Sequence, residues 1–167
     1  MYQKEYYIKL QKKFHPSDVK TVFILESHPI SGLYFYDTTG STGEPLFTAM
    51  MNLYGEKPRN KEEGLRLFSE RGCLLVDATY SPVNQLKGKE RNEKILEDFE
   101  GLVSDLESLG DKRKLDFILI KANICRLLEP RLVSLGFNIK NKGVVIPFPS
   151  TGQQTKFYQQ IKKVYPY

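Results

Sequence analysis

Cysteine is scarce in this chain: Cys73 and Cys125 are the only two among its 167 residues. This count excludes a zinc or iron–sulfur site with four cysteine ligands from the chain itself. Because each cysteine lies inside an apolar run and the two are far apart in the sequence, we expect two buried free thiols in a reducing compartment. We expect neither a metal ion nor another cofactor.

Long hydrophobic runs are also missing. No stretch approaches the roughly 20 apolar residues that a membrane-spanning helix needs. The first five residues lack the apolar core of a signal peptide. These two absences predict a cytoplasmic protein that does not associate with membranes.

Acidic residues are absent from one end of the sequence. The formal net charge is +5. Residues 130–167 contain no Asp or Glu, whereas residues 88–116 hold nine acidic and six basic residues. The basic end could attract phosphate backbones, or its lysines could simply keep the last helix soluble.

The composition is that of an ordinary globular domain. Hydrophobic residues make up 40% of the chain and charged residues 27%, both close to globular averages. A chain of this length suits one domain with its own core. The sequence therefore predicts a single domain over residues 1–167.

Short apolar runs indicate four buried strands. None of the runs alternates between apolar and polar residues, which is typical of strands covered on both faces and hence of a parallel sheet. The strands are expected at residues 21–25, 73–76, 115–120 and 144–146.

Segments with helical spacing separate these strands. Apolar residues three and four apart mark the helices, with Pro45 suited to a first turn and glycines at several ends. An α/β fold follows, which we predict to be a three-layer α/β/α sandwich with a central four-stranded parallel sheet. The helices are expected at residues 5–14, 45–54, 61–71, 89–109, 124–135 with an interruption at Pro130, and 153–164.

Polar and turn-forming residues follow each expected strand. In sheets of this class the ligand site lies just beyond the carboxyl ends of the strands. The segments that meet there begin with Glu26, Asp77, Lys121 and Pro147. Their convergence predicts a cleft without indicating its chemistry.

Three of these segments resemble motifs of the uracil-DNA glycosylase superfamily, in the same order along the chain. Glu26-Ser27-His28-Pro29, followed by Gly32-Leu33-Tyr34-Phe35-Tyr36, is similar to the family's water-positioning loop and base-stacking aromatic residue. Leu74-Leu75-Val76-Asp77-Ala78 is similar to the strand that ends at a base-reading Asn. Phe148-Pro149-Ser150 is similar to a late His-Pro-Ser motif. The resemblance covers about residues 21–164 and implies the family's three-layer fold.

Two positions depart from the family's pattern. Phe148 stands where the family has a His that stabilises charge on the departing base, and an apolar ring donates no hydrogen bond. Loss of one such donor costs on the order of 10²–10³ in rate, so the resemblance implies weakened catalysis. Asp77 replaces an Asn, and an ionised carboxylate offers acceptors only. Asp77 therefore predicts a buried protonated carboxyl, a preference for a base with an exocyclic amine, or no base binding.

The resemblance implies catalytic roles for Glu26 and His28. Hydrolysis of an N-glycosidic bond develops positive charge on the sugar, which Glu26 would stabilise while it orients or deprotonates water. His28 would donate a hydrogen bond to a phosphate or base oxygen. The alternatives are a capping or salt-bridged loop acid for Glu26 and a surface residue for His28.

Base binding is implied for Phe35 and Asp77. Phe35 would cover the face of a base extruded from the duplex, and its alternative is a core side chain. Asp77 would contact the base edge, and its alternative is a cap of the following turn.

The resemblance places the DNA contacts near the start of the last helix. Hydroxyls and free N–H groups there could bind a phosphate, although helix capping by Ser150 or Thr151 is an equal alternative. Lys121 could meet a phosphate or point into solvent, and the helix at residues 89–109 is expected to face away from DNA. The expected DNA-binding residues are Ser150, Thr151, Gly152, Gln153 and Lys156.

Together these features predict a DNA glycosylase that binds DNA and hydrolyses the N-glycosidic bond of uracil or another deaminated or damaged base. Two alternatives stay open. One is a catalytically weak or inactive nucleic-acid-binding module of the same fold. The other is a hydrolase or binder of free nucleosides or nucleotides.

Overall fold

The structure is a computed structural model, and it describes residues 4–166. Three strands and seven helices alternate along this part of the chain, which confirms the predicted α/β class. In chain order they are α1 (Lys4–Lys12), β1 (Thr21–Leu25), α2 (Pro45–Leu53), α3 (Lys61–Glu70), β2 (Cys73–Asp77), α4 (Gly88–Glu97), α5 (Phe99–Glu107), β3 (Asp116–Leu119), α6 (Ala122–Ser134) and α7 (Gln154–Lys162).

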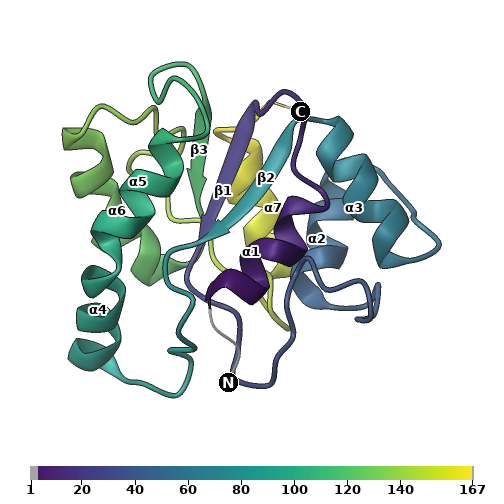
Figure 1. Ribbon diagram of the computed structural model, residues 1–167, viewed down its shortest axis with the longest axis horizontal. Coiled ribbons are helices and arrows are strands. Elements are labelled where there is room, and N and C mark those ends of the chain that lie inside the picture. Colours follow the sequence, from purple (N-terminus) through teal and green to yellow (C-terminus); the bar gives the residue numbers. More distant parts are fainter. Residues whose placement is uncertain (1–3, 167) are drawn as a thin grey trace.

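The strands form one parallel sheet in the order β2-β1-β3. Every residue of β1 and β2 is buried, as their continuous apolar runs predict. In Figure 1, α1 lies in front of the sheet and α7 behind it, so helices cover both faces. Leu25 pairs with Asp77 in the register, which brings the carboxyl ends of β1 and β2 to the same edge.

The predicted fourth strand is wrong, because residues 144–146 form no strand in the described chain. Ile139 makes a single bridge to Phe117 of β3. Beyond it, the Asn141 side chain accepts a hydrogen bond from the Leu119 N–H at 2.9 Å and donates one to the Leu119 carbonyl at 2.8 Å. One buried amide side chain thus satisfies the peptide groups that another strand would have used.

Side chains also close the outer edge of β2. The Gln11 side chain of α1 donates to the Leu75 carbonyl at 2.7 Å, and the Leu75 N–H donates to the Tyr36 hydroxyl at 2.8 Å. Both contacts are buried. They satisfy an edge residue that could otherwise pair with another chain, and they attach α1 to the sheet.

Two helix predictions need correction. The single helix expected at residues 89–109 is divided into α4 and α5 at Asp98. Aspartate has a low helix propensity, and the Asp98 side chain accepts a hydrogen bond at 2.5 Å from the hydroxyl of Thr79, which lies 19 residues earlier in the chain. Conversely, α6 continues through Pro130 without the expected interruption. Pro130 lies on the exposed side of α6, where solvent can satisfy the carbonyl that loses its partner.

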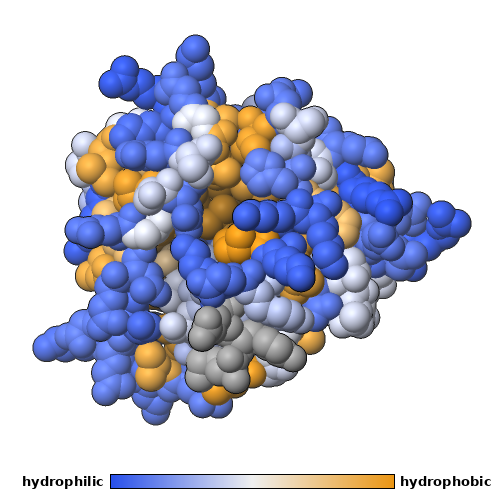
Figure 2. Space-filling model, viewed as in Figure 1, coloured by the Kyte–Doolittle hydropathy of each residue, from blue (hydrophilic) through white to orange (hydrophobic). Residues whose placement is uncertain are grey.

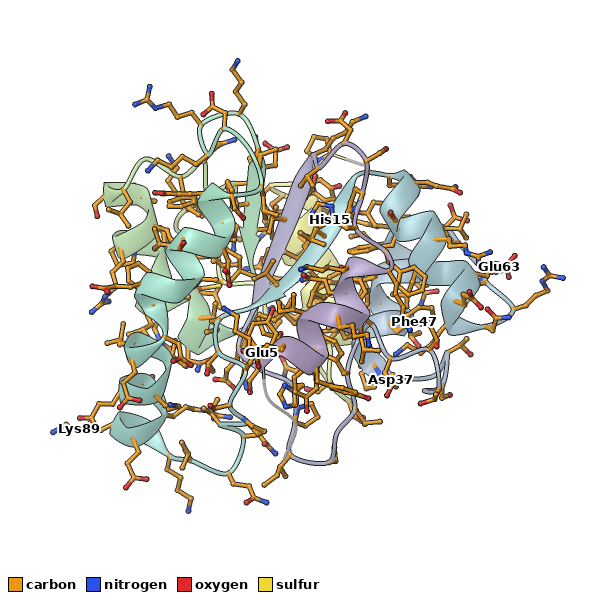
Figure 3. The ribbon with its side chains drawn as sticks, in the orientation of Figure 1. Glu5, His15, Asp37, Phe47, Glu63 and Lys89 are labelled. Atoms are coloured by element: carbon orange, nitrogen blue, oxygen red, sulfur yellow. The ribbon has the colours of Figure 1, made fainter. Side chains whose placement is uncertain are left out.

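The surface and the interior separate as expected for a globular domain. Figure 2 shows hydrophilic residues projecting around the periphery of one face, with apolar side chains between them. Phe47 points into the interior, whereas Lys89 projects from the start of α4 (Figure 3). Both cysteines are buried and free, which confirms the predicted burial and the unpaired state of the two thiols. Among the helices of residues 4–166, none has the length and apolar character needed to cross a bilayer.

Candidate functional site

A cavity of about 310 Å³ lies at the carboxyl edge of the sheet. This volume is at the lower end of the range for small-molecule sites. Aromatic and aliphatic side chains form most of its wall, and a few polar groups reach it from the ends of β1, β2 and β3. The lining residues are Leu25, Glu26, Ser27, His28, Pro29, Leu33, Tyr34, Phe35, Glu44, Pro45, Leu46, Phe47, Leu75, Asp77, Asn84, Lys121 and Phe148.

Four of the predicted site residues meet in this cavity. Glu26 and His28 come from the end of β1 and its loop, Asp77 from the end of β2, and Phe35 from the segment that leads to α2. Phe148 lines the same cavity. The order of polar residues after parallel strands therefore located a real cavity.

Glu26 lies at the centre of a charged cluster. Its side chain is 3% exposed. Oε1 is 2.5 Å from Lys121 Nζ and 3.1 Å from Arg91 Nη2, and Oε2 accepts a hydrogen bond from the Asn123 amide. Arg91 belongs to α4, so the helical region that was expected to face away from DNA contributes a cation to this cluster. The cluster joins the end of β1 to α4 and to the start of α6.

The contacts leave Glu26 with little spare hydrogen-bonding capacity. A carboxylate has about four acceptor positions. Lys121 and Arg91 share Oε1, while Asn123 takes one position on Oε2. A buried charge needs such partners to offset its loss of hydration. The open acceptor position is therefore on Oε2.

Asp77 is a buried carboxyl, 5% exposed, whose Oδ2 has no hydrogen-bond partner among residues 4–166. Burial raises its pKa to about 7; the charge of Glu26 adds to this effect, and the His28 backbone N–H opposes it. Near neutral pH the group therefore exists in both forms, and the protonated form offers one donor and one acceptor. The next backbone N–H, of Ala78, donates to the Leu25 carbonyl at 2.7 Å rather than to this side chain.

His28 is a buried residue rather than a surface one, with 4% exposure. Its ring stacks on Tyr7 of α1, with 3.9 Å between the centroids, and meets Tyr34 edge-on. Within the part of the chain that the structure describes, Nδ1 has no hydrogen-bond partner. Burial lowers the pKa of His28, so the imidazole is neutral at pH 7 and carries one N–H donor. Helix α1 thus orients this ring beside the cavity.

Phe35 fits both interpretations that the sequence allows. It is 7% exposed and packs edge-on against Phe68 at 5.2 Å between centroids. The same side chain borders the cavity together with Phe47. Phe35 is therefore a core residue whose free side forms part of the cavity wall.

A buried lysine supports this wall. Lys61 Nζ donates to the Tyr34 carbonyl at 2.9 Å and lies 3.2 Å from a carboxylate oxygen of Glu44. The Lys61 side chain is fully buried, and that burial lowers its pKa although Glu44 opposes the effect. These contacts hold the segment that carries Phe35 against the start of α3.

Sequence reasoning missed Lys61, Glu44, Arg91 and Asn123 as parts of the site. Arg91 stands in a strongly charged helix and Lys61 opens another, so both have the local pattern of solvated surface residues. Asn123 is the third residue after an expected strand and carried a weak positional signal.

The expected DNA-binding residues do not line the cavity. Ser150, Thr151, Gly152, Gln153 and Lys156 are exposed, on the segment that runs from Phe148 into α7. Neither Ser150 nor Thr151 caps α7, because the N-cap is Gln153 and no side chain bonds to the helix end. The segment is therefore free to contact another molecule beside the cavity.

No group of three or more His, Cys, Asp or Glu side chains within residues 4–166 could hold a metal ion. Comparisons with known proteins add no assignment, because no protein-family model matches the chain and no curated protein is similar to it.

Proposed function

We propose that this protein is a DNA glycosylase that hydrolyses the N-glycosidic bond of a deaminated or damaged base extruded from DNA. The observation that carries the proposal is the pairing of an immobilised buried carboxylate, Glu26, with an aromatic-walled cavity. The motif order of the uracil-DNA glycosylase superfamily adds support. In this proposal the helices on the two faces of the sheet complete a three-layer α/β/α sandwich of that type.

Glu26 acts on the sugar side of the bond. As the bond breaks, positive charge develops on the deoxyribose, and a nearby carboxylate lowers the energy of that state. Oε2 has one open acceptor position, which suits a hydrogen bond from the attacking water. Lys121, Arg91 and Asn123 keep the carboxylate in one orientation, so it needs no reorganisation during the reaction.

The cavity holds the base. Phe35 and Phe47 supply apolar surface for its faces. Asp77 contacts its edge with the unpartnered Oδ2. In its protonated form Asp77 offers a donor and an acceptor, the same combination as the asparagine amide that the family places there. The neutral ring of His28, which lines the same cavity as Asp77, supplies a further N–H.

The exposed segment around Ser150 and Gln153 contacts the DNA backbone next to the cavity. Its hydroxyls and the uncapped N–H groups of α7 are suitable donors to phosphate. Lys156 adds a positive charge within the first turn of the helix.

The test is a panel of single-stranded and duplex oligonucleotides that carry uracil, hypoxanthine, xanthine or an oxidised base. Alkali-sensitive strand cleavage reports release of the base. We expect cleavage of at least one substrate and a loss of at least 10²-fold with Glu26→Gln. Glu100→Gln, on the exposed surface of α5, is the matched control and should retain the wild-type rate.

Because Glu26→Gln leaves two cations without their carboxylate, thermal unfolding of each variant is measured in parallel. Asp77→Ala, which removes the base contact without touching that cluster, should also lose activity. Cleavage by wild type that neither substitution reduces would contradict the proposal.

A second candidate is a nucleic-acid-binding module of the same fold without catalysis. The observation that favours it is Phe148 in the cavity wall, where the resemblance leads us to expect a charge-stabilising His. This module would bind DNA with an affinity that falls with salt and with Lys156→Glu, and Glu26→Gln would leave binding intact. The same panel separates the two candidates, since only the enzyme releases a base.

A further inference from the structure

The proposed reaction needs a donor that Phe148 cannot provide. When the N-glycosidic bond breaks, the base departs with the bonding electrons and becomes an anion. We infer that Lys121 is a catalytic residue whose ammonium group stabilises this departing base. The inference rests on the proposed glycosylase function and adds to it a residue with a defined role.

Lys121 is connected through its backbone to the segment that carries Phe148. Both side chains line the cavity. The Lys121 backbone N–H donates to the Ile146 carbonyl at 2.8 Å, and Ile146 precedes Phe148 by two residues. The backbone of Lys121 is therefore joined to the segment that carries Phe148, where the expected donor is missing, while its side chain lines the same cavity.

The backbone of Lys121 is held in an unusual conformation. Its φ of 90° makes it the one non-glycine residue with positive φ among residues 4–166. Such conformations persist where the surroundings impose them, and they concentrate at functional sites. Here the hydrogen bond to Ile146 and a second from the Cys125 N–H to the Lys121 carbonyl, at 2.9 Å, hold the residue. This conformation lets Lys121 line the cavity at the start of α6.

The ammonium has donors to spare. Nζ lies 2.5 Å from Glu26 Oε1, which uses one of its three N–H groups. The side chain is 31% exposed, in contrast to the 3% of Glu26. Two N–H groups are therefore available to an oxygen or nitrogen of the base, in a charge-assisted contact that strengthens as negative charge develops.

The reaction then balances as a hydrolysis. The C1′–N bond breaks with both electrons going to the base, and the water oxygen bonds to C1′. Glu26 accepts one proton of that water. Lys121 keeps its own proton and holds the base anion by hydrogen bonds until solvent protonates it. No oxidant or cofactor enters the step.

Arg91 provides the comparison that separates this role from simple support of Glu26. Arg91 contacts the same oxygen, Oε1, at 3.1 Å, yet it is not among the residues that line the cavity. Removing either cation weakens the anchoring of Glu26. Only the loss of Lys121 should also weaken stabilisation of the leaving base.

The test compares single-turnover cleavage of oligonucleotides that contain uracil or 5-fluorouracil. The fluorinated base leaves more readily as an anion and needs less stabilisation. We expect Lys121→Met to slow release of uracil by about 10²–10³-fold, and to slow release of 5-fluorouracil by at least tenfold less than that. Arg91→Met should slow both substrates by the same factor.

Lys121→Gly guards against a folding artefact, because glycine adopts positive φ without strain. It should remain folded by circular dichroism and show the same dependence on the leaving base as Lys121→Met. An equal loss on both substrates, or no loss, would overturn the role of Lys121 while leaving the glycosylase proposal intact. Failure of the wild-type protein to release either of these bases, or any other base of the oligonucleotide panel, would overturn both proposals.

Discussion

The pH dependence of stability offers a test of the site that needs no substrate. Asp77 has a pKa of about 7 in the folded protein, against an ordinary value of 3.8. Between these two pH values the folded state keeps a proton that the unfolded chain releases. Stability therefore falls as pH rises through this interval, and the loss is complete above the folded pKa.

Replacing Asp77 with Asn removes this penalty. A shift of about three pKa units corresponds to roughly 4 kcal/mol once both states have titrated. At pH 5, ionisation of Asp77 has stabilised the unfolded chain relative to the folded protein by only about 2 kcal/mol. By pH 8 this relative stabilisation has reached the full value of roughly 4 kcal/mol. The stability of Asp77→Asn relative to wild type should therefore increase by about 2–3 kcal/mol between pH 5 and pH 8.

The assay is urea unfolding of both proteins at pH 5, 6, 7 and 8. The trend with pH is the diagnostic quantity, because the new amide donor lacks a guaranteed partner and costs about 1–3 kcal/mol at every pH. Burial lowers the pKa of His28, so protonation of this ring destabilises both proteins toward acid pH. This effect cancels in the difference between their free energies of unfolding. Glu100→Gln controls for the change in net charge. A difference that stays flat or shrinks with rising pH would refute the assignment of Asp77 as a buried, uncompensated carboxyl.

Two further predictions concern the cavity wall. Lys61→Met should lower the free energy of unfolding by about 3 kcal/mol, because it leaves Glu44 without its buried partner. Adding Glu44→Leu should restore much of that loss. If urea unfolding showed no recovery in the double variant, the result would contradict the pairing of Lys61 with Glu44. Gly64→Ala should cost about 1–3 kcal/mol, because a Cβ at this position collides with the Phe47 ring. Gly101→Ala, also helical but with open space around it, should stabilise the protein by about 0.5–1 kcal/mol, and the reverse ranking of the two alanines would refute the packing argument.

Apolar runs predicted the central strands well, because a strand buried on both faces needs an apolar side chain at nearly every position. The same criterion failed at residues 144–146. That run is equally apolar, but a strand also requires unpaired peptide groups beside it. The Asn141 side chain already occupies those of Leu119. Local composition carries no information about this competition.

The sequence likewise identified some residues of the candidate site and could not identify others. Glu26 and Asp77 could be identified from the sequence because each follows an apolar strand, and parallel strands end at a common edge. The sequence could not identify Arg91, whose neighbours make it look like a solvated residue of a charged helix. Its contact with Glu26 exists only because α4 packs beside the end of β1.

The sequence by itself determined the α/β class, the three strands of the sheet and the polar residues that follow them, since these depend on the periodicity and character of neighbouring residues. The tertiary structure decided which donors surround Glu26, how far Asp77 is removed from water, and which side chains close the edges of the sheet. These properties depend on burial and on contacts between distant segments. The pattern of any one segment cannot specify them.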